Sequence, residues 1–87
     1  MSYILLMKTV RYTADAVRDL KRHGNMAARV RQAVSEYAAT GAWANMVTRL
    51  VSSTASRMRV GDFRVIFEDG AERIVVTKVA PRGNAYD

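Results

Sequence analysis

The sequence contains no cysteine and only one proline, one tryptophan and one histidine. Without cysteine the chain has neither disulfide bonds nor thiolate metal sites. The single histidine, His23, has no suggestively spaced carboxylates around it, which excludes a metal cluster and a mechanism that needs two imidazoles. The longest apolar run, from Tyr3 to Met7, is too short to span a bilayer or to form the core of a secretory signal. We therefore expect a soluble cytoplasmic protein without a metal or other cofactor.

Acidic residues are also scarce: eight Asp and Glu stand against fourteen Lys and Arg, which gives a formal net charge of +6. Hydrophobic residues make up 49% of the 87 residues, an ordinary share for a folded protein. This length fits a single domain over residues 1–87 with one small core. So basic a small domain is typical of proteins that bind nucleic acid, an anionic surface or an acidic protein, although a merely soluble basic domain has the same composition.

The N-terminal part of the chain predicts a strand and a helix. Residues 2–9 form a compact apolar segment, which we interpret as the first strand. Residues 13–24 predict a short helix. Thr13 is expected to be its N-cap residue, and Gly24 is expected to end it in a left-handed C-terminal cap.

A second helix is expected from Met26 to about Ala39, because apolar residues recur there at spacings of three and four. Asn25 is expected to cap this helix and Gly41 to end it. The two helices together predict an antiparallel hairpin that packs on one face of a sheet. Residues 42–56 are ambiguous, since they suit either a further helical turn or an extended connection.

Residues 57–86 carry apolar and basic side chains in alternation, interrupted by turn signals at 61–62 and 69–70. Alternation with period two sends neighbouring side chains to opposite faces of a sheet, so one face is core and the other carries guanidinium groups. The expected strands span about residues 56–60, 63–68 and 73–79. Pairing is expected to stop before Pro81, which has no backbone N–H. The fold class is α+β: an N-terminal strand, a two-helix hairpin and a three-stranded antiparallel meander.

Two segments of this region carry a family resemblance. Residues 57–68 read Arg-Met-Arg-Val-Gly-Asp-Phe-Arg-Val-Ile-Phe-Glu, and residues 81–87 read Pro-Arg-Gly-Asn-Ala-Tyr-Asp. With the valine-rich strand between them, they resemble the RelE/ParE toxins of bacterial type II toxin–antitoxin modules. Length, basicity and element order extend the resemblance over the whole chain. The RelE branch cleaves messenger RNA in the ribosomal decoding site, whereas the ParE branch shares the scaffold and poisons DNA gyrase.

The resemblance to the RelE branch implies a metal-independent endoribonuclease, an mRNA interferase. It implies that the basic catalytic positions of the sheet are Arg57, Arg64 and Arg82, and that Tyr86 is the terminal aromatic residue of the site. RNA cleavage without a metal needs a base, cations that stabilise the phosphorane, and an acid. The planar arginine fork suits phosphate oxygens, and Tyr86 is expected to stack on a base, with proton transfer as the alternative.

Arg59 also matches the motif, and we expect Arg59 and Lys78 to bind RNA. The chain departs from the family pattern at Ala55, where the family often has lysine, and at Pro81, where some members have histidine. Purely structural interpretations stay open beside these. Arg57 and Arg59 suit a solvated strand face. Arg64 suits an exposed pair with Glu68 or Asp62, and Tyr86 suits an anchor for the tail.

The resemblance further implies two kinds of partner: the 70S ribosome with its messenger RNA, and an acidic antitoxin that wraps the basic surface and the helices. We expect exposed apolar residues to receive the antitoxin at Trp43, Met46 and Leu50, although Trp43 also suits a core anchor. Two other functions remain: a ParE-like gyrase inhibitor without catalysis, and a nucleic-acid-binding module without toxicity.

Overall fold

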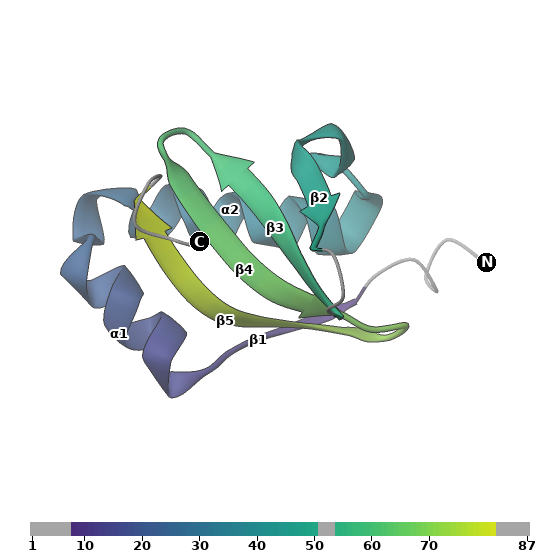
Figure 1. Ribbon diagram of the computed structural model, residues 1–87, viewed down its shortest axis with the longest axis horizontal. Helices are drawn as coiled ribbons and strands as arrows, with labels where there is room; N and C mark the ends of the chain where they lie inside the picture. Colours follow the sequence, from purple (N-terminus) through teal and green to yellow (C-terminus); the bar gives the residue numbers. More distant parts are fainter. Residues whose placement is uncertain (1–7, 51–53, 82–87) are drawn as a thin grey trace.

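The computed structural model describes residues 8–50 and 54–81. Five strands form one sheet in the order β1-β5-β4-β3-β2, and helices lie along it (Figure 1). The strands are β1 (Thr9–Tyr12), β2 (Val47–Arg49), β3 (Ala55–Val60), β4 (Phe63–Asp69) and β5 (Arg73–Pro81). The helices are α1 (Ala14–Arg22), α2 (Gly24–Thr40) and the 3-10 turn η2 (Ala44–Met46).

The predicted α+β class is confirmed, with additions that the sequence left open. The meander of β3, β4 and β5 is antiparallel, as expected, whereas β1 pairs with β5 in parallel. The ambiguous segment 42–56 contains both a helical turn, η2, and the short edge strand β2, which pairs with β3. Strand β5 runs to Pro81, two residues beyond the predicted end, and Pro81 is the cross-strand partner of Phe63. The expectation that pairing stops before Pro81 is therefore wrong, because proline lacks the backbone N–H but can still occupy the last position of a strand.

The first strand lies later in the chain than predicted. It spans Thr9–Tyr12, so the expected strand over residues 2–9 is wrong for Lys8, and residues 2–7 lie outside the described part. Pairing with β5 explains the shift, because the Thr9 N–H donates to the Glu72 carbonyl and the Thr13 N–H to the Val76 carbonyl. The hydrogen bonds to β5 therefore define the residues that form β1.

The junction between the helices also differs from the prediction. Thr13 is the N-cap residue of α1, as expected, and its hydroxyl accepts a hydrogen bond from the Ala16 N–H at 3.2 Å. Gly24, however, begins α2 and does not end α1 in a left-handed cap. His23 is the one residue between the helices, so Asn25 lies inside α2 and is not its cap. At the other end, Gly41 has φ 81° and closes α2 as predicted.

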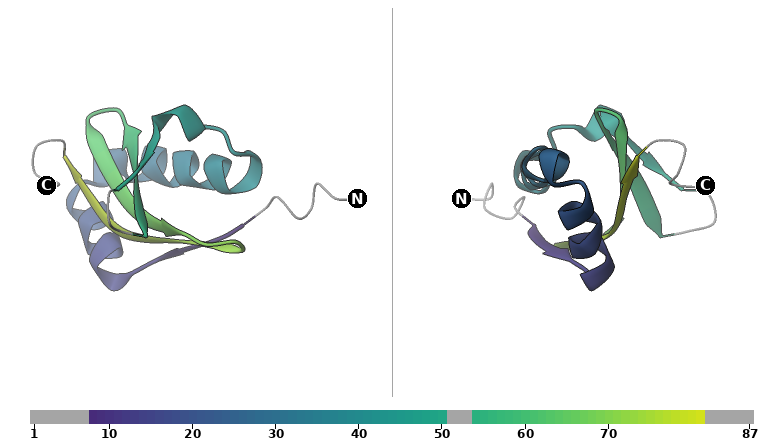
Figure 2. Two further views of the ribbon diagram at one scale, coloured as in Figure 1. Left: turned by 45° about the vertical axis from the view of Figure 1, so that its right-hand side comes forward. Right: turned by 90° about the vertical axis from the view of Figure 1, so that its left-hand side faces the viewer.

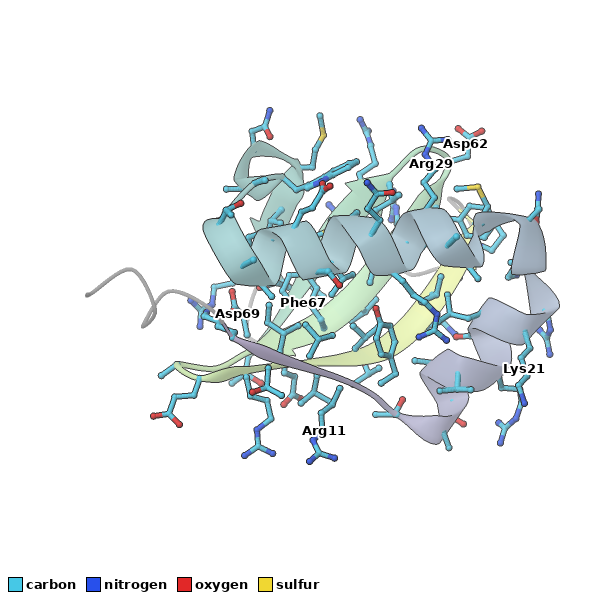
Figure 3. All side chains as sticks on the ribbon, turned by 180° about the vertical axis from the view of Figure 1, so that it is seen from behind. Arg11, Lys21, Arg29, Asp62, Phe67 and Asp69 are labelled. Carbon is cyan, nitrogen blue, oxygen red and sulfur yellow. The ribbon has the colours of Figure 1, made fainter. Side chains whose placement is uncertain are left out.

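The core lies between the sheet and the two helices, which cover the same face (Figure 2). Helices α1 and α2 meet at a steep angle, and α2 crosses above Phe67 (Figure 3). The largest fully buried side chains are Phe67, Leu20, Met58, Ile74, Val30, Val34, Val60, Val65, Val76 and Val79. The opposite face of the sheet carries no described helix and is left open. None of the helices in the described ranges is long and apolar enough to cross a membrane.

Strand β5 contains an irregularity that changes which side chains face the core. Ile66 pairs with Lys78, whereas the next residue of β4, Phe67, pairs with Val76. Thr77 is therefore an extra residue in β5, as in a β-bulge, and its hydroxyl donates to the Ile66 carbonyl at 3.3 Å. The bulge reverses the alternation of side chains along the second half of the strand.

Candidate nucleic-acid interface

Alternation along β3 and β4 separates their arginines from the core. The buried residues of these two strands are Ser56, Met58, Val60, Val65 and Phe67. Arg57, Arg59 and Arg64 occupy the alternate positions, so their side chains belong to the face away from the helices. The sequence predicted this separation correctly, because period two is a local property of a strand.

These three arginines line one hollow of about 220 Å³, which we call the arginine hollow. The other lining residues are Asn45, Met46 and Thr48. Strand register assembles the hollow, because Arg59 is directly opposite Arg64, and Arg57 is directly opposite Thr48. Of the described residues that line it, none is acidic. Like charges directly opposite each other weaken a sheet, so the arrangement favours an anion that binds between them.

The bulge in β5 adds Lys78 to the same face. Residues Val76 and Val79 are both buried, which the extra residue between them makes possible, and Lys78 is exposed. Lys78 and Arg57 are both cross-strand partners of Ile66, so they lie in one row on either side of β4. Uninterrupted alternation from Val76 would have turned residue 78 into the core. The expected placement of Lys78 beside the other basic residues therefore depends on the bulge.

Charges of both signs gather at the other end of the sheet, near the β4–β5 turn. Two hollows lie there, and Glu72 and Arg73 line both of them. Glu68 also lines the first hollow, and Arg11 also lines the second. We call this region the turn end and define it by Lys8, Arg11, Glu68, Asp69, Glu72 and Arg73. Positive and negative side chains offset each other at the turn end, so a polyanion is expected to bind there more weakly than in the arginine hollow.

A hydrogen-bonded group anchors the turn end to α2. Lys8 Nζ lies 2.5 Å from Asp69 Oδ1, and the Tyr37 hydroxyl donates to Asp69 Oδ2 at 2.8 Å. Burial, the hydrogen bond and the negative charge of Asp69 together raise the pKa of Tyr37 to about 12. The Tyr37 ring also meets Phe67 edge to face, with ring centroids 5.6 Å apart. Figure 3 shows Phe67 and Asp69 beneath the same part of α2.

The three residues predicted to contact an antitoxin lie in different surroundings. Trp43 has a left-handed φ of 77°, packs against the core, and donates from Nε1 to Glu36 Oε1 at 2.8 Å. This hydrogen bond and one from Gln32 lower the pKa of Glu36. The contacts of Trp43 support its alternative role as a core anchor. Met46 is 41% exposed and lines the arginine hollow, whereas Leu50 is half-buried.

Two of the predicted catalytic residues, Arg82 and Tyr86, lie outside the described residues. His23, the single histidine, lies at the junction of the helices, where its ring meets the Phe63 ring edge to face with centroids 4.9 Å apart. Within the described ranges, no three His, Cys, Asp or Glu residues are grouped so that they could hold a metal ion.

Asn45 and Thr48 line the hollow but were not predicted as site residues. Thr48 reaches it only because β2 pairs with β3, and Asn45 because η2 leads into that strand. The segment was ambiguous in sequence, so no local signal placed either residue beside Arg57. An indication was available in the valine and threonine at 47–48, which suit a short edge strand.

Comparison with protein-family models gives no match, and no curated protein matches by sequence. The fold does match solved structures. The toxin–antitoxin complex RelBE2 from Mycobacterium tuberculosis contains a chain 23% identical with a TM-score of 0.70, over 87% of this chain and 99% of that chain. In the RelE–RelB complex from Pyrococcus horikoshii OT3 the identity is 22% and the TM-score 0.73, over 91% and 99%.

YafQ from Escherichia coli has a TM-score of 0.69 at 13% identity, over 93% of this chain and all of that chain. Such low identities with nearly complete coverage show a common fold and leave the site residues to be argued from this chain. The match extends over helices and sheet together, as the resemblance of the sequence motifs implied. The chain therefore has the fold of the RelE-type toxins.

Proposed function

We propose that this protein is the toxin of a type II toxin–antitoxin module and acts as a ribosome-dependent mRNA endonuclease. The observation that carries the proposal is the arginine hollow, where Arg57, Arg59 and Arg64 gather without an acidic lining residue among those described. The RelE-type fold supports the same conclusion, because its solved examples include chains of toxin–antitoxin complexes.

The hollow suits the charge that develops during RNA cleavage. Attack by a 2′-hydroxyl adds negative charge to the phosphate, and guanidinium groups fixed on a sheet stabilise that charge without reorganising. Arg57 and Arg64 are the proposed phosphate clamp, with Arg59 and Lys78 as contacts to neighbouring phosphates. Arginine remains protonated, so it stabilises the phosphorane without transferring a proton.

Proton transfer has to come from elsewhere. The described residues of the hollow include no histidine, carboxylate or tyrosine. Arg82 and Tyr86 follow β5 in sequence and remain the proposed fourth cation and stacking aromatic residue, with proton transfer by Tyr86 as the alternative. A site that mainly supplies positive charge accounts for dependence on the ribosome, which would orient the message and contribute ionisable groups.

We propose that the cognate antitoxin is acidic and covers the arginine hollow. Met46 supports this arrangement, because its apolar side chain is exposed and lies beside the arginines that line the hollow. A partner segment that places an apolar residue on Met46 and carboxylates on the arginines would exclude RNA from the hollow. Trp43 and Leu50 would then help to hold η2 and β2, the elements on which Met46 is presented.

Induced expression in a bacterial host, with mapping of new mRNA 5′ ends within minutes, tests the enzymatic proposal. We expect new ends inside translated codons with the wild-type chain and none with the Arg82→Ala/Tyr86→Ala variant. The control is the Arg18→Ala/Lys21→Ala variant, which loses two charges from exposed positions of α1. Intact messages in growth-arrested wild-type cells would contradict the nuclease proposal, and full toxicity of the Arg82/Tyr86 variant would contradict that site assignment.

A second candidate, a ParE-like gyrase inhibitor without catalysis, is favoured by one observation. The described lining of the arginine hollow supplies charge and no group suited to acid–base catalysis near neutral pH. That candidate predicts growth arrest with a DNA-damage response and intact messages in the same experiment. A nucleic-acid-binding module without toxicity predicts neither growth arrest nor new mRNA ends.

A further inference from the structure

A second basic hollow lies where the end of α1 meets β5, at the edge of the open face. It has a volume of about 360 Å³. Its lining residues are Asp19, Arg22, His23, Lys78, Val79, Ala80 and Pro81. We call it the edge hollow. Neither the resemblance nor the proposed cleavage assigns Arg22 or this hollow a role.

The edge hollow exists because α1 caps a free stretch of strand edge. Strand β1 pairs with β5 only as far as Val76, so beyond that residue none of the described strands pairs with β5 on that side. Helix α1 supplies side chains there: the Thr13 hydroxyl donates to the Thr77 carbonyl at 3.4 Å, and Asp19 Oδ2 accepts from the Val79 N–H at 3.0 Å. These bonds fix the bulge, and with it Lys78, against the end of α1.

The side-chain charges give the edge hollow a positive balance. Arg22 and Lys78 stand against the single carboxylate of Asp19, which is already hydrogen-bonded to the backbone. The negative end of the α1 dipole and the positive end of the α2 dipole meet at His23 and largely offset each other. The two cationic side chains therefore decide the sign of the potential, and the hollow favours an anion.

Cross-strand neighbours connect the edge hollow with the arginine hollow. Ala80, which lines the edge hollow, is the cross-strand partner of Arg64, which lines the other. Lys78 and Arg57 share Ile66 as partner. Neighbouring strands lie about 4.8 Å apart, so the hollows are separated by roughly one or two strand spacings, a distance that a flexible single strand of RNA spans with successive phosphates.

We infer that the edge hollow is a second anion subsite, in which Arg22 and Lys78 bind a backbone phosphate of the same single-stranded RNA that occupies the arginine hollow. The inference rests on the proposed function, since it extends the path of that RNA from the open face to the end of α1. Arg22 is its distinctive residue, because it belongs to a helix and lies outside the basic face of the sheet.

Salt dependence of RNA binding tests the subsite, because each phosphate contact to a single strand contributes about 0.7 to the slope of log K against log salt. The probe is a fluorescently labelled oligouridine of about nine nucleotides, a length within the range of about 4–16 that single-strand sites cover. We expect Arg22→Gln/Lys78→Gln, which removes both cations from the one phosphate, to lower the slope by about 0.7, and Arg22→Gln alone to lower it by part of that amount. Glutamine keeps the apolar stems, and thermal melting verifies that both variants fold.

The matched control is Arg18→Gln/Lys21→Gln, which removes two charges from the same helix outside the hollow. We expect the slope of this variant to equal that of the wild type. Equal slopes for the Arg22 variants and the wild type would overturn the subsite. It would also be overturned if the slope of the control variant were lowered as much as the slopes of the Arg22 variants. Absence of measurable oligouridine binding by the wild type would overturn it as well. The proposed cleavage is judged separately by mRNA ends in cells.

Discussion

The arginine hollow and the turn end occupy opposite ends of one sheet and handle charge in opposite ways. In the arginine hollow Arg59 is opposite Arg64, and no described lining residue is acidic. At the turn end Lys8 is paired with Asp69, and Arg73 shares its surroundings with Glu72. Both ends belong to one sheet and share strand β4, which carries Arg64 at one end and Glu68 and Asp69 at the other, so the side chains cause the difference.

This difference separates what stabilises the chain from what it presents to a partner. Opposite charges at the turn end satisfy one another and tie the sheet to Tyr37 of α2. Like charges directly opposite each other disfavour strand pairing, and a phosphate that binds between Arg59 and Arg64 would offset their repulsion. We therefore expect changes at the turn end to alter stability and changes in the arginine hollow to alter activity.

The largest effect is expected from a substitution in the core that supports both ends. Phe67 is fully buried and contacts Tyr37, so Phe67→Ala is expected to lower the free energy of unfolding by about 3–5 kcal/mol. Ile66→Ala, one position away and on the open face, is the control and is expected to cost less. Urea denaturation measures both, and equal losses would contradict the assignment of the two faces.

The next effect separates the two ends by activity. Arg59→Ala/Arg64→Ala is expected to lower mRNA cleavage about 100-fold, the scale on which a transition-state charge contact acts. Arg11→Ala/Arg73→Ala removes the same net charge from the turn end and is expected to leave cleavage nearly unchanged. Counts of mRNA 5′ ends at matched expression measure both. Equal losses would mean that net charge, and not the arginine hollow, determines activity.

A smaller effect concerns pH at the turn end. Because the pKa of Tyr37 is raised from 10.0 to about 12, the folded state holds this proton more tightly than the unfolded state. Its contribution to stability is therefore complete below pH 10 and is lost as the pH rises toward 12. Tyr37→Phe is expected to cost about 1.5–3 kcal/mol at neutral pH by removing the hydrogen bond to Asp69.

Thermal melts of the wild type and the Tyr37→Phe variant between pH 8 and 12 (the range set by that pKa) check this prediction. We expect the difference between the two proteins to shrink at the alkaline end. A constant difference over that range would show that the proton on Tyr37 is not linked to folding.

The smallest expected effect sharpens the contrast within the arginine hollow. Arg59→Thr removes one charge of the Arg59–Arg64 pair and introduces a residue that suits strands. It is expected to raise the free energy of unfolding by about 0.2–1 kcal/mol while cleavage falls. Lys21→Thr on α1 is the charge-matched control. A loss of stability in Arg59→Thr would mean that the cross-strand arginines support the sheet and do not strain it.

Most helix and strand positions could be predicted because their signals are local. The spacing of three and four that marks α2, the N-cap at Thr13 and the alternation along β3 all involve residues a few positions apart. The junction at Gly24 was predicted wrongly for a related reason: glycine suits a left-handed cap, but the backbone there continues almost directly into the second helix. The conformational preference of Gly24 is overridden there, because the packing of both helices on one sheet sets the turn between them.

The sequence by itself determined the charge of this protein, its α+β class and the appearance of Arg57, Arg59 and Arg64 on one strand face, because composition and period two need no distant partner. Only the tertiary structure decided that Thr77 bulges and turns Lys78 outward, that Thr48 reaches the arginine hollow, and that Arg22 lies beside Lys78. The first two depend on the register between neighbouring strands, and the third depends on the packing of α1 against β5. Register is set by what the whole core can pack, so it has no signature in any one segment.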